Sequence, residues 1–420
     1  MHRLRPVLVA LLVGLYLVAG AGRAWTAVAG TQNGRDYATY HYATQVALDG
    51  GDPYDTKALS AAARAEGTRK QVHPFFYPPP FLVGMVWSAP LSLPVAYKAW
   101  FFLQNACLFG ILAVFWRWLG ASPLLLVGVL ATFTPLPDNL KMGQANLPVL
   151  LLAVVGLWRG NGLALGAAGM AKMSPALFLA GWGAKGRWRS VAVAAATAVG
   201  LSILTLPLVG LDAQVRFFTE ILPGFSSGEY HGLRVPITLP ANHSIPDLLN
   251  QAWPGPDRHH LSPNVALATK LLSLGLLGAL IPVFRRARGP VGEACALGAL
   301  TVLLTITPVY AYEHHLAFLL LPIVALGVAL ERGVLARKWW AAAGIAYFFV
   351  AWPLFWLRPA QKALPALEWV FQESKFFAAI ALAALCVLAA WRTGGPKRET
   401  ERGTERETER QTEGGSPSSS

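Results

Sequence analysis

The chain has 420 residues, of which 54% are hydrophobic and only 14% are charged. A soluble domain usually carries about 25% charged residues, so this composition excludes an ordinary soluble protein. The net charge of +13 does not indicate nucleic-acid binding, because Arg and Lys cluster at the ends of apolar segments, where the positive-inside rule places them. Apolar runs near the length of a bilayer span recur along the chain and predict an all-α polytopic membrane protein. The cysteines lie inside these runs and indicate neither a disulfide framework nor a metal site: Cys107, Cys295 and Cys386.

The first apolar run covers residues 6–21 and follows a short basic start. Such a pattern resembles a signal peptide, but no clear cleavage site follows, and we expect a retained first helix with a cytoplasmic N-terminus. Residues 23–73 are then external. Within them, apolar and aromatic residues at helical spacing over 37–47 predict an external amphipathic helix along the membrane surface. Asp36 stands at its start, and Gly50-Gly51-Asp52-Pro53 ends it.

Three consecutive prolines follow at 78–80, and backbone of this kind is tolerated at membrane depth only against protein or a cavity. The short run 81–94 is therefore interpreted as re-entrant. Another break, at 172–175, divides the apolar pieces 163–171 and 176–184, and each is too short to span a bilayer. We interpret them as a broken hairpin with Lys172 at its tip. The remaining spans alternate in direction by their basic ends: 95–116, 123–134, 147–158, 191–210, 265–284, 292–307, 316–330, 339–356 and 376–391.

These segments predict one transmembrane domain over residues 1–392, a bundle of about 10–12 helices with re-entrant pieces. A long external loop is expected from about 211 to 264. The tail 393–420 repeats Thr-Glu-Arg and ends in Gly, Pro and Ser, which is typical of a disordered segment. It is expected to be cytoplasmic.

With this topology the unusual polar residues gather on the external face, and polar groups at membrane depth normally mark a functional path. Each has an ordinary alternative. Asp36 is open to a helix-capping role, His314-His315 to an interfacial pair, and Lys172 to snorkelling. A metal site needs a third ligand at defined spacing, and none is evident. The full set comprises Asp36, Tyr77, residues 139–144 with Gln144, Lys172, Asn242, His243, Ser244, Glu313, His314 and His315.

The order of these elements is more specific than any one of them. After the first helix come Asp-x-x-x-Tyr, Gly-Gly-Asp-Pro-Tyr-Asp and Tyr-Pro-Pro, then Lys-Met-Gly-Gln-Ala-Asn, Ala-Lys-Met-Ser-Pro, Asn-His-Ser and Pro-x-x-x-x-Glu-His-His. The series resembles glycosyltransferase family 87, membrane enzymes of the GT-C class, over residues 30–330. The resemblance implies a GT-C-like helix bundle and an inverting transfer on the non-cytoplasmic side. It also implies a polyprenyl-monophosphate sugar donor, expected to be mannose, and no cofactor.

The resemblance implies roles for individual residues. Asp36 matches the position of the family's catalytic aspartate, and a base is needed to take the acceptor hydroxyl proton. His314 or His315 matches its late histidine. Substrate contacts are expected at Tyr77, Gln144, Lys172, Asn242, His243, Ser244 and Glu313. The residues after Asn-His-Ser lack an expected basic residue, so the ligand of the donor phosphate is open among Lys172, Lys141, Arg234 and Arg258.

The expected partners are the donor, a lipid or glycan acceptor and the membrane, with no nucleic acid. The expected location is the inner membrane of a bacterium, with the site facing outward. Two alternatives are a lipid or sugar-lipid transporter and a ligase that uses a lipid diphosphate. A transporter predicts polar paths on both faces, whereas this chain shows polar clustering on one.

Overall fold

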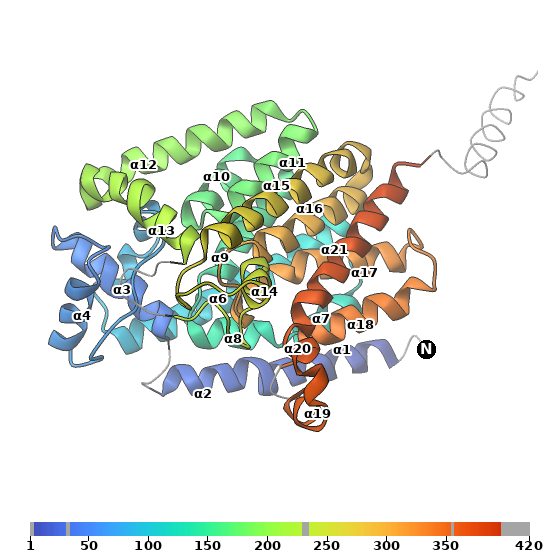
Figure 1. The fold of residues 1–420 in the computed structure, drawn as a ribbon, viewed down its shortest axis with the longest axis horizontal. Coiled ribbons are helices and arrows are strands. Elements are labelled where there is room, and N and C mark those ends of the chain that lie inside the picture. The colour runs from blue at the N-terminus through green and yellow to red at the C-terminus, as the bar shows by residue number, and fades with distance from the viewer. Residues whose placement is uncertain (1–3, 31–33, 229–234, 354–356, 396–420) are drawn as a thin grey trace, which may run out of the picture.

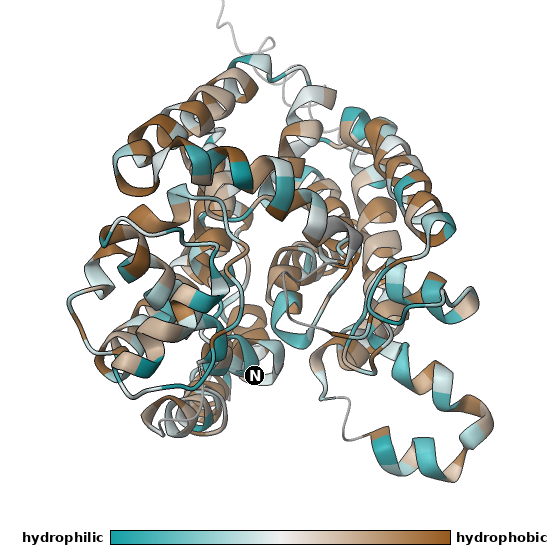
Figure 2. Ribbon diagram, turned by 60° about the vertical axis from the view of Figure 1, so that its left-hand side comes forward, coloured by the Kyte–Doolittle hydropathy of each residue, from teal (hydrophilic) through white to brown (hydrophobic). Residues whose placement is uncertain are grey.

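The structure is a computed structural model that describes residues 4–30, 34–228, 235–353 and 357–395. These residues form helices and loops and contain no strand, which confirms the predicted all-α class. Arg234 and the tail from 396 lie outside them. In Figure 2 the helices are largely apolar along their lengths, and the hydrophilic residues gather in loops and at helix ends.

Among the described residues, seven helical segments are long and apolar enough to cross a membrane, as expected of a multi-pass protein. They are Arg5–Ala29 (formed by α1, Leu4–Leu15, η1, Tyr16–Gly22, and α2, Arg23–Ala29), α6 (Leu93–Leu119), Trp188–Phe225, α15 (Pro263–Arg286), α16 (Gly289–Ile306), Glu313–Glu331 and α21 (Ser374–Thr393). A bent pair, α7 (Pro123–Thr132) and α8 (Pro135–Met142), turns through 59°. Three shorter apolar helices are α9 (Asn146–Arg159), α10 (Gly162–Ala171) and α18 (Trp339–Ala351).

The predicted interruptions of the membrane region are present. Residues 81–94 contain only α5 (Pro80–Val83) and η2 (Val86–Ser88) before α6 begins. The hairpin after α10 consists of η3 (Ser174–Leu177) and α11 (Phe178–Ala184), with Lys172 in extended backbone between them and α10. Pro175 lies in η3, where its fixed φ suits the first turn of a new helix.

The helix expected over 37–47 is present as α3 (Arg35–Leu48), but it does not lie along a surface. Residues 37–44 are all buried, around the whole circumference of the helix. The surrounding elements are α4 (Thr56–Ala65), α5, α6, α8 and the long helix α12 (Trp188–Arg216). Tyrosines and alanines occur on both faces of α3, and both faces are buried. The spacing of apolar residues alone indicated only one buried face.

The long loop predicted from about residue 211 begins later in the structure. Helix α12 bends at Gly210, where φ is 75°, and the chain continues through η4 (Phe217–Ile221) and α13 (Leu222–Ser227). The loop then contains α14 (Ile245–Ala252) and ends at α15. The charged residues within 211–220, Asp212, Arg216 and Glu220, led to the prediction of a loop there, whereas the helix continues through them.

The core of the bundle lies at α16 and at η5 (Glu313–Leu319) with α17 (Leu320–Glu331). In each of these two spans 83% of the most apolar stretch is buried, compared with 11% for Trp188–Phe225 and 22% for α15. The latter two therefore lie at the periphery, where their apolar side chains face lipid. The chain ends with α18, α19 (Arg358–Ala363), η7 (Pro365–Leu367), α20 (Glu368–Gln372) and α21 (Figure 1).

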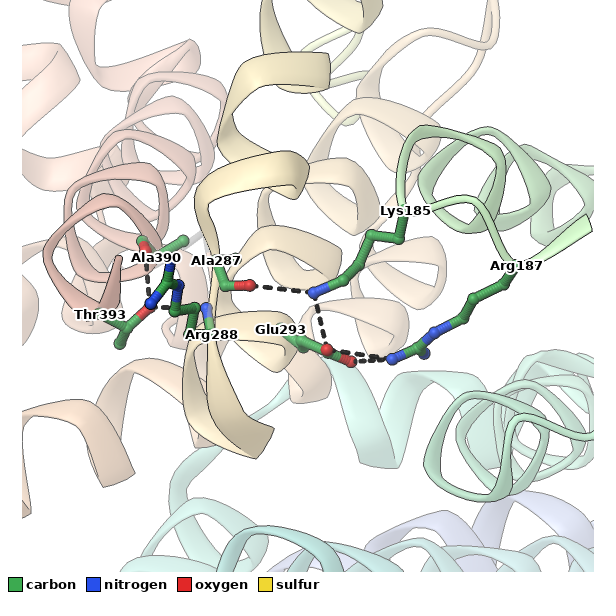
Figure 3. Close-up of polar contacts among 7 residues, drawn as sticks. All are labelled: Lys185, Arg187, Ala287, Arg288, Glu293, Ala390 and Thr393. Atoms are coloured by element: carbon green, nitrogen blue, oxygen red, sulfur yellow. Dashed lines mark hydrogen bonds and ion pairs between the residues drawn. The ribbon is translucent and has the colours of Figure 1, made fainter. Parts of the chain in front are cut away.

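One end of the bundle is basic. Lys185 Nζ and Arg187 each contact the Glu293 carboxylate at 2.7 Å, which joins the α11–α12 turn to α16 (Figure 3). Lys185 also donates to the Ala287 carbonyl, and the Arg288 amide donates to Thr393 at the end of α21. We call this the basic end. Helix α3 lies at the opposite end of the bundle, which we call the site end (Figure 1).

Candidate active site

Asp36 lies in the first turn of α3, which begins at Gly34 in left-handed backbone with φ 81°. A Cβ atom at Gly34 would lie 2.7 Å from the Tyr97 ring, so only glycine allows the chain to pass this ring. One Asp36 oxygen, Oδ2, accepts a hydrogen bond of 2.9 Å from Gln144 Nε2, and the other lies 3.6 Å from His73 Nδ1. The carboxylate is 17% exposed, which leaves it partly reachable from outside the protein.

Gln144 lies in the corner between α8 and α9, at the position predicted for an external turn. Helix α8 ends at Gly143, whose φ is 73° and whose Cβ would lie 2.6 Å from Tyr37 Cβ. This glycine lets the corner pack directly on α3. Gln144 Oε1 accepts a hydrogen bond of 2.8 Å from the Tyr77 hydroxyl, and Tyr40 donates to the Tyr77 oxygen at 2.7 Å. The amide of Gln144 therefore binds Asp36 through its nitrogen and Tyr77 through its oxygen, and Tyr40 binds Tyr77 in turn.

Lys172 approaches the same corner from the tip of the broken hairpin. Its Nζ donates to Asn146 Oδ1 at 2.7 Å and lies 5.8 Å from the centre of the Tyr77 ring and 5.7 Å from that of Phe318. Among the described residues no carboxylate lies within 4.0 Å of this ammonium. A lysine with one hydrogen bond and two aromatic faces retains donors for an anionic group.

His314 and His315 lie in η5, which opens the buried span that includes α17. The carbonyl of His314 accepts a hydrogen bond of 2.8 Å from Asn146 Nδ2, so Asn146 links this histidine to Lys172. Asp36 reaches the same corner through Gln144, which also binds Tyr77, the ring that lies 5.8 Å from Lys172 Nζ. The His315 Nδ1 atom accepts from the Tyr312 amide at 3.2 Å, which leaves the proton of the neutral ring on Nε2. Its ring packs edge-on against His314, with centroids 4.3 Å apart.

Glu313, His243 and the loop residues beside it form a neighbouring cluster. The Glu313 carboxylate lies 3.0 Å from Lys375 Nζ and 3.6 Å from His243 Nε2. Asn242 Nδ2 donates to the carbonyls of Ile237 and Val309 at 2.9 Å, and its Oδ1 accepts from the Ala311 amide. Ser244 donates to the Val309 carbonyl and caps α14 through the Asp247 amide. The side chains of Asn242 and Ser244 thus form hydrogen bonds with backbone groups. Their contacts with substrate remain predictions.

Two other candidates for the donor phosphate are exposed to solvent. Lys141 is exposed at the end of α8, and Arg258 is exposed in the long loop. Two other carboxylates of the first loop have roles in turns. Asp52 accepts from the Tyr54 amide and pairs with Arg216. Asp55 caps α4 by accepting from the Lys57 amide at 2.8 Å.

The electrostatic environment keeps Asp36 ionised. Burial on its own would raise the pKa of this carboxyl, but the contact with His73, the charge interaction with His314 and the hydrogen bond from Gln144 together hold the pKa below its usual value. An ionised carboxylate with one oxygen not bound by Gln144 is suited to accept a proton from a substrate hydroxyl.

Comparison with known proteins assigns the family. The model of glycosyltransferase family 87 matches residues 75–308, more than half of the chain. The chain belongs to glycosyltransferase family 87. It is therefore a membrane glycosyltransferase, and the residues matched include Tyr77, Gln144 and Lys172. Asp36 and His314 lie on either side of the matched region.

A characterised relative is similar over most of the chain. It is the polyprenol-phosphate-mannose-dependent alpha-(1-2)-phosphatidylinositol pentamannoside mannosyltransferase of Mycolicibacterium smegmatis. It is 30% identical over 345 residues, which cover 76% of this chain and 74% of the relative. No solved structure matches the chain.

Four residues in the site or beside it were not among the sequence-predicted site residues. Asn146 belongs to the Lys-Met-Gly-Gln-Ala-Asn motif, so the sequence offered a signal for it. His73 is near the three-proline run, and Tyr40 lies one turn from Asp36 on α3. The only sequence signal for Lys375 was a positive charge at the start of the last apolar run. Nothing in the sequence indicated that it pairs with Glu313.

Proposed function

We propose that this family 87 enzyme transfers mannose, with inversion, from a polyprenyl-monophosphate donor to a lipid or glycan acceptor. The proposed location is the outer side of a bacterial inner membrane. The observation that carries the proposal is the meeting of Asp36, Lys172 and His314, which come from three distant segments and are joined in one corner through Gln144, Tyr77 and Asn146. The donor and the sugar are supported by the relative, whose name specifies polyprenol-phosphate-mannose.

The chemistry needs a base on one side of the anomeric carbon and positive charge on the other. The acceptor hydroxyl oxygen attacks the anomeric carbon while its proton passes to the free Asp36 oxygen. The bond between the anomeric carbon and the phosphate oxygen breaks, and its electron pair leaves on the phosphate. Polyprenyl phosphate gains a negative charge in this step, and the Lys172 ammonium and the His314 imidazole stabilise it. Tyr77 and the proline run border the path proposed for the lipid chain.

The proposed base is held in place by a network that does not take part in proton transfer. Gln144 donates to one Asp36 oxygen at 2.9 Å and so leaves the second oxygen for the acceptor. Tyr77 fixes the Gln144 amide in this orientation, because the amide oxygen accepts from the Tyr77 hydroxyl, which itself accepts from Tyr40. Such preorganisation lowers the cost of reaching a reactive geometry.

A donor panel tests the proposal. The purified protein is incubated with radiolabelled polyprenyl-phosphate mannose, with the arabinose and glucose analogues, and with GDP-mannose, each with a bacterial lipid extract as acceptor. We expect label from polyprenyl-phosphate mannose to appear in acceptor lipids and label from GDP-mannose to stay in the donor. Transfer from GDP-mannose alone would contradict the proposed donor class.

The side of the membrane is tested by labelling single cysteines in whole cells. The three native cysteines are buried and are first replaced. Ala61 is exposed on α4 at the site end, and Ala336 is exposed between α17 and α18, next to the basic residues Arg337 and Lys338. An impermeant maleimide should label A61C in intact cells and A336C only after lysis. The reverse pattern would place the site on the cytoplasmic side.

The pH profile tests the environment of Asp36. Because its pKa lies below the usual value, Asp36 stays ionised as the pH falls from 7 to about 5, and the rate should not drop through its titration in that range. His73→Gln removes a contact that lowers the pKa, so the acid limb of kcat/KM should move to higher pH. An acid limb that is the same in both proteins would show that another group controls it.

A further inference from the structure

Lys375 is a buried cation at the start of the last membrane span. It is the second residue of α21, and its side chain is 0% exposed. Its Nζ lies 3.0 Å from Glu313 Oε2 and donates to the Val350 carbonyl at 2.9 Å. An ionisable residue inside a membrane segment is costly and normally marks a functional element.

The ammonium of Lys375 does not line the site itself. Its two contacts are Glu313 and the end of α18, whereas Lys172 contacts Asn146, Tyr77 and Phe318. The other charged or titratable groups that act on the Glu313–Lys375 pair are His243, on the loop before α14, and Asp138, on α8. Glu313 thus lies between an ammonium and an imidazole, and it directly precedes His314.

The segment that carries His314 depends on contacts from outside it. Helix η5 is a 3₁₀ helix of seven residues, and such helices rarely exceed three or four residues because their hydrogen-bond geometry is poor. Two contacts from other helices hold its first turn. Asn146 on α9 binds the His314 carbonyl at 2.8 Å, and Lys375 on α21 binds the Glu313 carboxylate at 3.0 Å.

We propose that Lys375 is a positioning residue, whose ion pair with Glu313 fixes the first turn of η5 and thereby places His314 against the sugar donor. The proposal rests on the proposed function in one respect, because His314 is taken to face the donor phosphate. It assigns Glu313 to holding η5, whereas the sequence suggested a substrate contact. Both Glu313 and Lys375 lie outside the region matched by the family model, residues 75–308.

A double-mutant cycle tests the proposal, with Lys375→Met, Glu313→Gln, the double variant and Lys375→Arg. For each protein we measure thermal stability in detergent, and kcat and KM for the donor that supports turnover in the wild type. Lys338→Met, at the exposed start of α18, is the matched control. The stability measurements need no donor, so they test the ion pair even if the proposed donor is wrong.

We expect Lys375→Met to lower Tm and to reduce kcat about 10²-fold, as small displacements of reacting groups do, with donor KM nearly unchanged. The double variant should regain much of the Tm, because no buried charge is left unpaired, but not the kcat. The loss of kcat in the double variant should equal that in either single variant, and Lys375→Arg should retain most activity.

A double variant with the kcat of the wild type would show that the ion pair serves stability alone. A raised donor KM in Glu313→Gln, or losses that add in the double variant, would make Glu313 a substrate ligand.

Discussion

Replacing Asp36 by Asn is expected to lower turnover by roughly 10²–10⁴-fold, the usual contribution of a general base. The substitution keeps the shape of the side chain and removes the proton acceptor. Gln144 donates to Asp36 Oδ2 at 2.9 Å, and an Asn oxygen at that position still accepts this bond. Donor affinity and Tm should therefore stay near those of the wild type. Turnover with saturating donor, together with donor affinity, measures both effects.

Asp52→Asn is the matched control for this experiment. Asp52 lies in the same loop, but its carboxylate accepts from the Tyr54 amide and pairs with Arg216. We expect this variant to lose some stability and to keep most of its turnover. If Asp36→Asn retains wild-type turnover and Asp52→Asn abolishes it, the base has been assigned to the wrong carboxylate.

Lys172→Met should weaken donor binding by about 10–100-fold, because a hydrogen bond to a charged group contributes roughly 1.5–3 kcal/mol. Methionine keeps much of the length of the side chain, while the ammonium that contacts Asn146 and lies near the Tyr77 and Phe318 rings is lost. The folded protein should be retained. Binding of a non-transferable polyprenyl-phosphate sugar, measured by quenching of tryptophan fluorescence, reports the affinity.

Lys141→Met provides the control for Lys172, since Lys141 is exposed on α8 near the same corner. Its replacement should leave the affinity within about twofold, because an exposed charge is screened by solvent. An unchanged affinity in Lys172→Met, or a larger loss in Lys141→Met, would move the phosphate away from the tip of the broken hairpin.

The sequence predicted the membrane helices well because hydropathy is a local property. It also predicted the three-proline interruption, the break at Lys172 and the corner at Gln144, since proline and glycine act on the backbone where they stand. The burial of α3 was not predicted. Its environment is set by helices far along the chain, among them α12, which continues past Gly210.

The candidate site was predicted in its parts but not in its connections. Asp36, Gln144, Lys172 and His314 were selected because each is polar at a membrane boundary, and the structure places them in one corner. Asn146 joins Lys172 to His314 through its amide, a role that depends on three-dimensional contact. Asn242 illustrates the reverse case: a polar residue in a suggestive motif whose side chain bonds to backbone in three places.

The most direct test of the account is an experimental structure of the Asp36→Asn protein with an intact polyprenyl-phosphate sugar bound. This variant should bind the donor and fail to consume it. The account predicts the phosphate against Lys172 and His314, with the sugar between them and position 36. A phosphate bound elsewhere, for example among the arginines of the basic end, or a sugar remote from position 36, would contradict it.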